Sequence, residues 1–128
     1  MIVLDSSAAI RATLPQKDRA LFQSIIQTEI CSSPSLFLSE TSNVLWKEVQ
    51  FNALPINIAR ELQEIIHGMT EIIPDDTLIT QALTIALSDN HSVYDCLFIA
   101  LSRELKAPIL TADKKLKQKF SNDNFIDI

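Results

Sequence analysis

Four acidic residues, far apart in the sequence, are the side chains best suited to chemistry. Asp5 ends an apolar run, Glu40 interrupts the apolar face of a helical segment, Asp95 stands at the start of another helix, and Asp113 follows a short apolar strand. Hard cations such as Mg²⁺ and Mn²⁺ take oxygen ligands, and they support phosphodiester hydrolysis by activating water and stabilising the leaving oxygen. We therefore take these four acids as candidate metal ligands and catalytic residues.

Each acid also has a purely structural explanation. Asp5 and Asp113 are good helix N-caps, and Asp95 lies three residues after Ser92, where the pair could form a capping box. Glu40 is harder to explain in this way, because burying an unpaired carboxylate is costly and no cation lies three or four residues away in the sequence. The stronger argument is that a parallel sheet would bring all four positions together.

Short apolar segments alternate with helical patterns along the chain, and no hairpin signal such as Asn-Gly occurs. This order predicts an α/β fold, a three-layer sandwich with a mostly parallel sheet of four to five strands flanked by helices, in one domain over residues 1–128. Strands are expected at 1–4, 28–32, 71–74 and 109–111, with a further edge strand at 124–128. Helices are expected from Asp5 or Ser6 to Pro15, at 18–27, 34–51, 55–68, from Asp75 or Asp76 to 87, at 93–105 and at 113–120.

Ligands of open parallel sheets bind outside the carboxyl ends of the strands, where the strand order reverses. Asp5 and Asp113 each stand at such an end. Ser6 and Thr111 are placed to orient the aspartates, and Asn43 shares the helix side of Glu40 through its three-residue spacing.

The periodicity also predicts which helix faces are buried. In the 18–27 helix the expected core residues are Ala20, Leu21 and Ile25, with Ile26 as a fourth candidate. The 55–68 helix is expected to bury Ile58, Leu62 and Ile65, together with Ile66 or Met69.

The amino-acid composition excludes several kinds of functional site. A single glycine, Gly68, excludes a Walker loop, a dinucleotide fingerprint and a serine-hydrolase elbow, all of which need several glycines. Cys31 and Cys96 lie in separate apolar segments and are expected to be buried, reduced thiols. His67 and His91 have no paired spacing and are expected to lie at the surface. The start of the chain does not suit a signal peptide and no long apolar run occurs, so we expect a soluble cytoplasmic protein without membrane contact.

The charge distribution bears on nucleic-acid binding. A net charge of −5 argues against a protein that holds nucleic acid over a whole face. The lysines close to Asp113 could still form a local patch for phosphate, and the alternative is a solvated helix face. The candidate RNA contacts are Lys106, Lys114, Lys115 and Lys117, with Lys119 beside them.

Four segments, MIVLDSSAAI, LSETSNVL, SVYDCLFIAL and APILTADKKL, resemble in order and spacing the signature segments of PIN-domain ribonucleases, in particular the VapC toxins. The resemblance covers nearly the whole chain, although the loop NHSVYD lacks the glycine often found there. It implies a Mg²⁺- or Mn²⁺-dependent endoribonuclease whose acidic site is Asp5, Glu40, Asp95 and Asp113, supported by Ser6, Asn43 and Thr111. It further implies an RNA substrate, a small cognate antitoxin that occupies the site, and a homodimer.

Two alternatives stay open at this point. A phospho-acceptor receiver domain also has acids at strand ends, but it would need paired acids after the first strand and a lysine ending the fifth. A PIN-like domain could also bind RNA or a partner without cutting.

Overall fold

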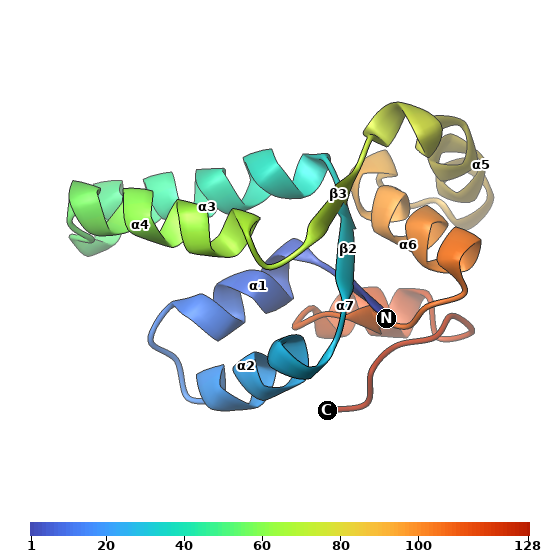
Figure 1. Cartoon of the computed structure of the whole chain (residues 1–128). Helices are drawn as coiled ribbons and strands as arrows, with labels where there is room; N and C mark the ends of the chain where they lie inside the picture. Colours follow the sequence, from blue (N-terminus) through green and yellow to red (C-terminus); the bar gives the residue numbers. More distant parts are fainter.

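The computed structural model describes all residues, 1–128. Four short strands alternate with seven α-helices and one 3₁₀ turn (Figure 1). In chain order the elements are β1 (Ile2–Leu4), α1 (Ser6–Thr13), α2 (Arg19–Thr28), β2 (Cys31–Pro34), α3 (Leu36–Asn52), α4 (Ile56–His67), β3 (Glu71–Ile73), η1 (Asp75–Thr77), α5 (Ile79–Asp89), α6 (Val93–Leu105), β4 (Ile109–Leu110) and α7 (Lys114–Lys119).

The strands form one parallel sheet in the order β3-β2-β1-β4. Helices α1 to α4 lie on one side of this sheet and α5 and α6 on the other (Figure 1). The structure therefore confirms the predicted α/β sandwich. All three residues of β1 are fully buried, which explains why this strand carries no polar side chain.

The strand order reverses beside β1, because β1 pairs with β2 on one edge and with β4 on the other. The chain leaves β1 at Asp5 and the neighbouring strand β4 at Thr111. The carboxyl ends of β1 and β4 therefore form the switch point at which parallel sheets bind ligands.

The second strand lies further along the chain than predicted. Strand β2 is Cys31–Pro34 rather than 28–32, and α2 continues to Thr28. The Ser33 hydroxyl donates to the Leu4 carbonyl at 2.7 Å and shares a hydrogen bond with the Thr70 hydroxyl at 2.8 Å. These bonds allow small polar residues to occupy a central strand, a possibility that the apolar pattern could not reveal.

Two helix faces agree only in part with their predictions. Helix α2 buries the predicted Ile26 and also Phe22, whereas Ala20 and Leu21 are exposed. Similarly, α4 buries the predicted Ile66 but leaves Ile65 exposed. The aromatic ring of Phe22 decides the orientation of α2, because it is the largest apolar surface on that helix.

Other details complete the fold. The expected edge strand at 124–128 is reduced to a single parallel bridge between Ile109 and Phe125, so the sheet has four strands.

Cys31 and Cys96 are free and buried, as expected, and burial raises the pKa of each thiol to about 11. None of the helices combines the length and the apolar character that a membrane crossing would require.

Candidate functional site

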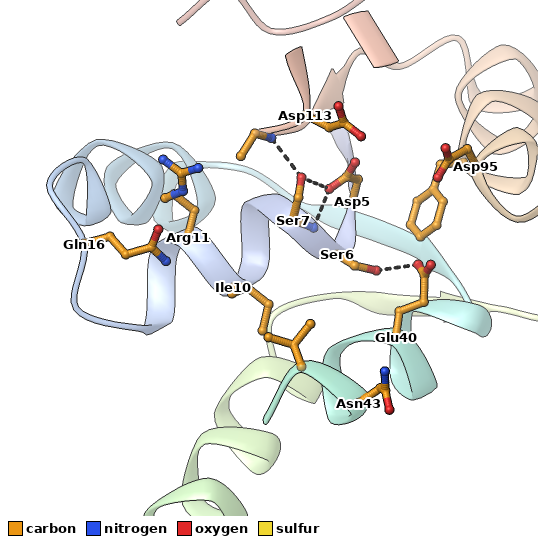
Figure 2. Close-up of a pocket in the computed structure, with 13 residues that line it drawn as sticks. Asp5, Ser6, Ser7, Ile10, Arg11, Gln16, Glu40, Asn43, Asp95 and Asp113 are labelled. Atoms are coloured by element: carbon orange, nitrogen blue, oxygen red, sulfur yellow. Dashed lines mark hydrogen bonds between the residues drawn. The ribbon is translucent and has the colours of Figure 1, made fainter. Parts of the chain in front are cut away.

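All four predicted acids line one cleft of about 530 Å³ at the carboxyl ends of β1 and β4 (Figure 2). We call this the acidic cleft. Asp5 reaches it from the end of β1, Glu40 from α3, Asp95 from α6 and Asp113 from the start of α7. Four segments that are distant in sequence therefore converge, as the parallel-sheet argument predicted.

Asp5 is the most buried of these acids, with 7% of its surface exposed. Its Oδ1 accepts hydrogen bonds from the Ser7 amide at 2.6 Å, the Ser7 hydroxyl at 2.5 Å and the Ala8 amide at 3.2 Å, which makes Asp5 the N-cap of α1. Its Oδ2 accepts from the Thr111 hydroxyl at 2.6 Å. Burial raises the pKa of Asp5, and these hydrogen bonds only partly oppose that effect. Capping and a place in the site are thus compatible.

Thr111 and Ser7 join the ends of β1 and β4. The Thr111 hydroxyl that donates to Asp5 also accepts from the Asp113 amide at 3.0 Å, and the Ser7 hydroxyl accepts from the Ala112 amide at 3.0 Å. The hydrogen bond from Thr111 to Asp5 is the contact that the predicted orienting role of Thr111 requires. The part that Ser7 plays in the site was not predicted, although a hydroxyl two residues after an N-cap aspartate is a local signal for such a contact.

Glu40 is half-buried and accepts a hydrogen bond on Oε1 from the Ser6 hydroxyl at 2.8 Å. Ser6 thus orients Glu40 and not the aspartates, because the first turn of α1 directs it toward α3. Burial raises the pKa of Glu40, and the nearby negative charges of Asp95 and Asp5 raise it further. Asn43 also lines the cleft but forms no hydrogen bond with a carboxylate.

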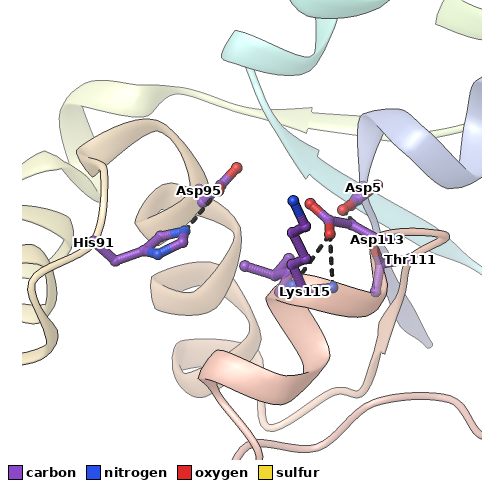
Figure 3. Close-up of polar contacts among 7 residues, drawn as sticks. Asp5, His91, Asp95, Thr111, Asp113 and Lys115 are labelled. Atoms are coloured by element: carbon purple, nitrogen blue, oxygen red, sulfur yellow. Dashed lines mark hydrogen bonds and ion pairs between the residues drawn. The ribbon is translucent and has the colours of Figure 1, made fainter.

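Asp95 lies in the first turn of α6, and its Oδ2 is 2.7 Å from Nε2 of His91 (Figure 3). Ser92 makes no side-chain cap, so the capping box is absent and Asp95 pairs with the histidine instead. His91 was expected at the surface, yet only 25% of its side chain is exposed. The four-residue spacing of these two residues was the available signal.

Asp113 is exposed and caps α7 as predicted, with Oδ1 accepting from the amides of Lys115 at 3.0 Å and Leu116 at 3.1 Å. The cap fixes this carboxylate at the mouth of the acidic cleft. Its Oδ2 has no hydrogen-bond partner within the protein.

The donor set suits a hard divalent cation. In Glu40, Asp95 and Asp113 one carboxylate oxygen is held by the protein while the other forms no hydrogen bond with it. No three His, Cys, Asp or Glu side chains are arranged to hold one ion together. This arrangement still fits Mg²⁺, which usually keeps several water ligands and takes only one or two carboxylates directly.

The predicted lysines divide into two groups. Lys114, Lys115 and Lys117 line a second cleft of about 700 Å³. Lys106 lies at the end of α6, in a separate pocket beside Arg103. The structure therefore does not bring Lys106 to the acidic cleft.

Each of three comparisons with known proteins gives at least one match. The PIN domain family model matches residues 2–119. Ribonuclease VapC3 of Pyrobaculum aerophilum is 26% identical over 129 residues, covering 93% of this chain and 94% of that protein. The crystal structure of PAE2754 from Pyrobaculum aerophilum superposes with a TM-score of 0.78, over 97% of this chain and 82% of that one, at 18% identity. The last likeness concerns the fold alone.

Proposed function

The chain belongs to the PIN domain family, and on that premise we propose that it is a metal-dependent endoribonuclease of the VapC type, which cleaves RNA phosphodiester bonds. The observation that carries the proposal is the convergence of Asp5, Glu40, Asp95 and Asp113 on one cleft at the switch point of the sheet. A further support is that a curated relative of nearly equal length bears the name ribonuclease.

In this proposal the four acids together would hold Mg²⁺ or Mn²⁺, one or two of them directly and the others through water ligands of the ion. When bound, the ion lowers the pKa of a water molecule and balances negative charge on the scissile phosphate. The protein supplies the rigidity of the site. Asp5 is held by Ser7 and Thr111, Glu40 by Ser6 and Asp95 by His91, so each carboxylate keeps its direction without rearrangement.

The electrostatics of the cleft favour a cation. Burial raises the pKa of Asp5, and burial together with neighbouring negative charge raises the pKa of Glu40, so both carboxyl groups hold protons more tightly than they would in water. Metal binding requires ionised carboxylates and should therefore release protons. The expected proton release is a property that a purely structural cluster of capping aspartates would not have.

The family resemblance extends the proposal to partners. We expect a small cognate antitoxin that covers the acidic cleft, and a homodimer. Several large apolar side chains of α3 and α4 are exposed, including Trp46, Phe51 and Ile56. Such a surface is of the kind that protein partners cover.

The receiver-domain alternative has no observation in its favour. A single acid, Asp5, follows β1, and the two serines after it hold acids of the cleft. Binding without cleavage is the alternative that an experiment must separate from catalysis.

The test is incubation of the purified chain with mixed structured RNA, in Mn²⁺ or in chelator. We compare the wild type with Asp95→Asn, which keeps the shape of the side chain, and with Asp76→Asn, an exposed acid outside the cleft. Cleavage is expected only with metal and only in the wild type and Asp76→Asn. Equal cleavage by Asp95→Asn would contradict the proposal, and RNA binding without any cleavage would leave the non-catalytic alternative.

A further inference from the structure

The acidic cleft adjoins the second cleft, which we call the basic cleft. It is lined by Lys114, Lys115 and Lys117, and also by two acids that lie outside the acidic cleft, Asp18 and Asp127. The two share Arg11, Ala112 and Asp113 as lining residues. A ligand bound beside the four acids could thus continue directly into the basic cleft.

Arg11 is the only basic residue that lines the acidic cleft. It lies one turn after Ser7 on α1, and Figure 2 shows it with Gln16 at the end of the cleft opposite Asp95. A ligand that spans the acidic cleft therefore meets negative side chains at one end and a guanidinium at the other.

Neighbouring groups hold the Arg11 side chain in place. Nη1 donates to both carboxylate oxygens of Asp18, at 3.1 and 3.0 Å, and the guanidinium carbon lies 6.0 Å from the centroid of the Phe22 ring. Nε and Nη2 have no hydrogen-bond partner in the protein. Since 35% of the side chain is exposed, these donors are accessible to a ligand.

The lysines of the basic cleft are also available. None of Lys114, Lys115 and Lys117 takes part in an ion pair. Lys117 donates to the Ile126 carbonyl at 3.2 Å, and Figure 3 shows Lys115 extending beside Asp113. Asp18 is paired with Arg11, so three lysines without an ion pair stand against two such acids, Asp113 and Asp127, in this cleft. This local balance suits an anionic ligand better than the net charge of −5 would suggest.

We propose that Arg11 binds a phosphodiester next to the scissile one, and that the basic cleft holds the backbone of the RNA strand beyond it. This inference rests on the proposed ribonuclease function. Arginine presents a planar set of donors that matches phosphate oxygens, and Asp18 and Phe22 orient it before the ligand arrives. The lysines supply unspecific charge, so this contact fixes the position of the strand and not its sequence.

The inference is tested by RNA binding in chelator, where cleavage does not interfere. The probe is a short fluorescein-labelled single-stranded RNA of mixed sequence, followed by anisotropy over a series of salt concentrations. The variants are Arg11→Gln and Lys115→Gln, and the control is Arg60→Gln, an exposed arginine of α4 outside both clefts. Thermal unfolding of each variant checks that it is folded.

We expect Arg11→Gln to weaken RNA binding about tenfold, because it removes a charge-assisted contact. Both cleft variants should lower the slope of log affinity against log salt by about one. Arg60→Gln should leave affinity and slope unchanged.

The outcomes separate this inference from the proposed function. If the wild type cleaves RNA with Mn²⁺ but Arg11→Gln and Lys115→Gln bind RNA as the wild type does, the role of Arg11 and the basic cleft is overturned and the proposed ribonuclease function stands. If RNA binding depends on Arg11 but no variant or condition gives cleavage, the ribonuclease proposal fails, and the binding of the RNA backbone by Arg11 and the basic cleft stands. If the wild type instead binds a polyglutamate peptide and not RNA, an acidic protein segment occupies the basic cleft and the inference is overturned.

Discussion

The imidazole of His91 pairs with the Asp95 carboxylate across a distance of 2.7 Å, from Nε2 to Oδ2. The ring also lies edge-on to Phe120, with centroids 5.3 Å apart and planes at 85°. Phe120 follows α7 and is buried, so the position of the histidine depends on the packing of a distant segment. Asp95, whose side chain is 39% exposed, is therefore fixed by a neighbour and not by burial.

This pair predicts a loss of metal binding when the histidine donor is removed. His91→Leu should weaken Mn²⁺ binding by about 10- to 100-fold, since partners that orient metal ligands have effects of this size. His91→Gln keeps a donor and should remain closer to the wild type. Calorimetric titration with Mn²⁺ measures the affinity, and His67→Leu, at the end of α4, is the control. Equal affinities in His91→Leu and the wild type would show that the contact does not orient Asp95.

Asp5→Asn should abolish RNA cleavage while leaving the metal-free protein as stable as the wild type or more stable. Asparagine caps helices as well as aspartate does, so α1 should keep its N-cap. The substitution also removes a charge whose burial is unfavourable. Cleavage assays should show a loss of at least about a hundredfold, and urea unfolding in chelator measures the stability. Metal-dependent cleavage by this variant would contradict the role assigned to Asp5.

Stability without metal should depend on pH through Asp5 and Glu40. Their ordinary pKa values are 3.8 and 4.5, and in the folded protein both are raised. The folded state therefore binds protons more tightly than the unfolded state. Their contribution to stability is fully present below the ordinary values and is lost as the pH rises through the raised ones.

Urea unfolding of the wild type and Glu40→Gln in chelator, from about pH 4, below the ordinary pKa of glutamate, to about pH 8, measures this effect. The glutamine can still accept from Ser6, but it does not ionise. Its stability relative to the wild type should therefore increase with pH. A difference that stays constant over this range would show that the pKa of Glu40 is not raised, and added Mn²⁺ should reduce the wild-type dependence.

The sequence was most informative where local signals agree with the tertiary structure. Helix α6 has the predicted bounds, because residues 96–101 form a continuous apolar run and Ser92 and Pro108 stand on either side of the helix. The convergence of the four acids on one cleft could be predicted because strand ends and helix starts place side chains predictably. Contacts that depend on distant segments were not visible. Ser33 lies in a strand because Leu4 and Thr70 accommodate its hydroxyl, and Arg11 meets Asp18 only because α2 folds back on α1.

Thr111 gives the sharpest test of how the ends of β1 and β4 share the site. Its hydroxyl donates to Oδ2 of Asp5 and accepts from the Asp113 amide, although Asp5 is 106 residues away in the sequence. Thr111→Val keeps the shape of the side chain but leaves both groups without this partner, which should cost about 1–3 kcal/mol of unfolding free energy and lower cleavage.

Thr111→Ser is the matched control, because it keeps the hydroxyl and removes only a methyl group. It should cost about 1 kcal/mol and retain cleavage. Urea unfolding and RNA cleavage of both variants separate the two contributions. If the hydroxyl orients Asp5, activity follows the hydroxyl while stability falls in both variants. If serine and valine lower cleavage equally, Thr111 acts through packing alone, and the orientation of Asp5 must come from Ser7 and the first turn of α1.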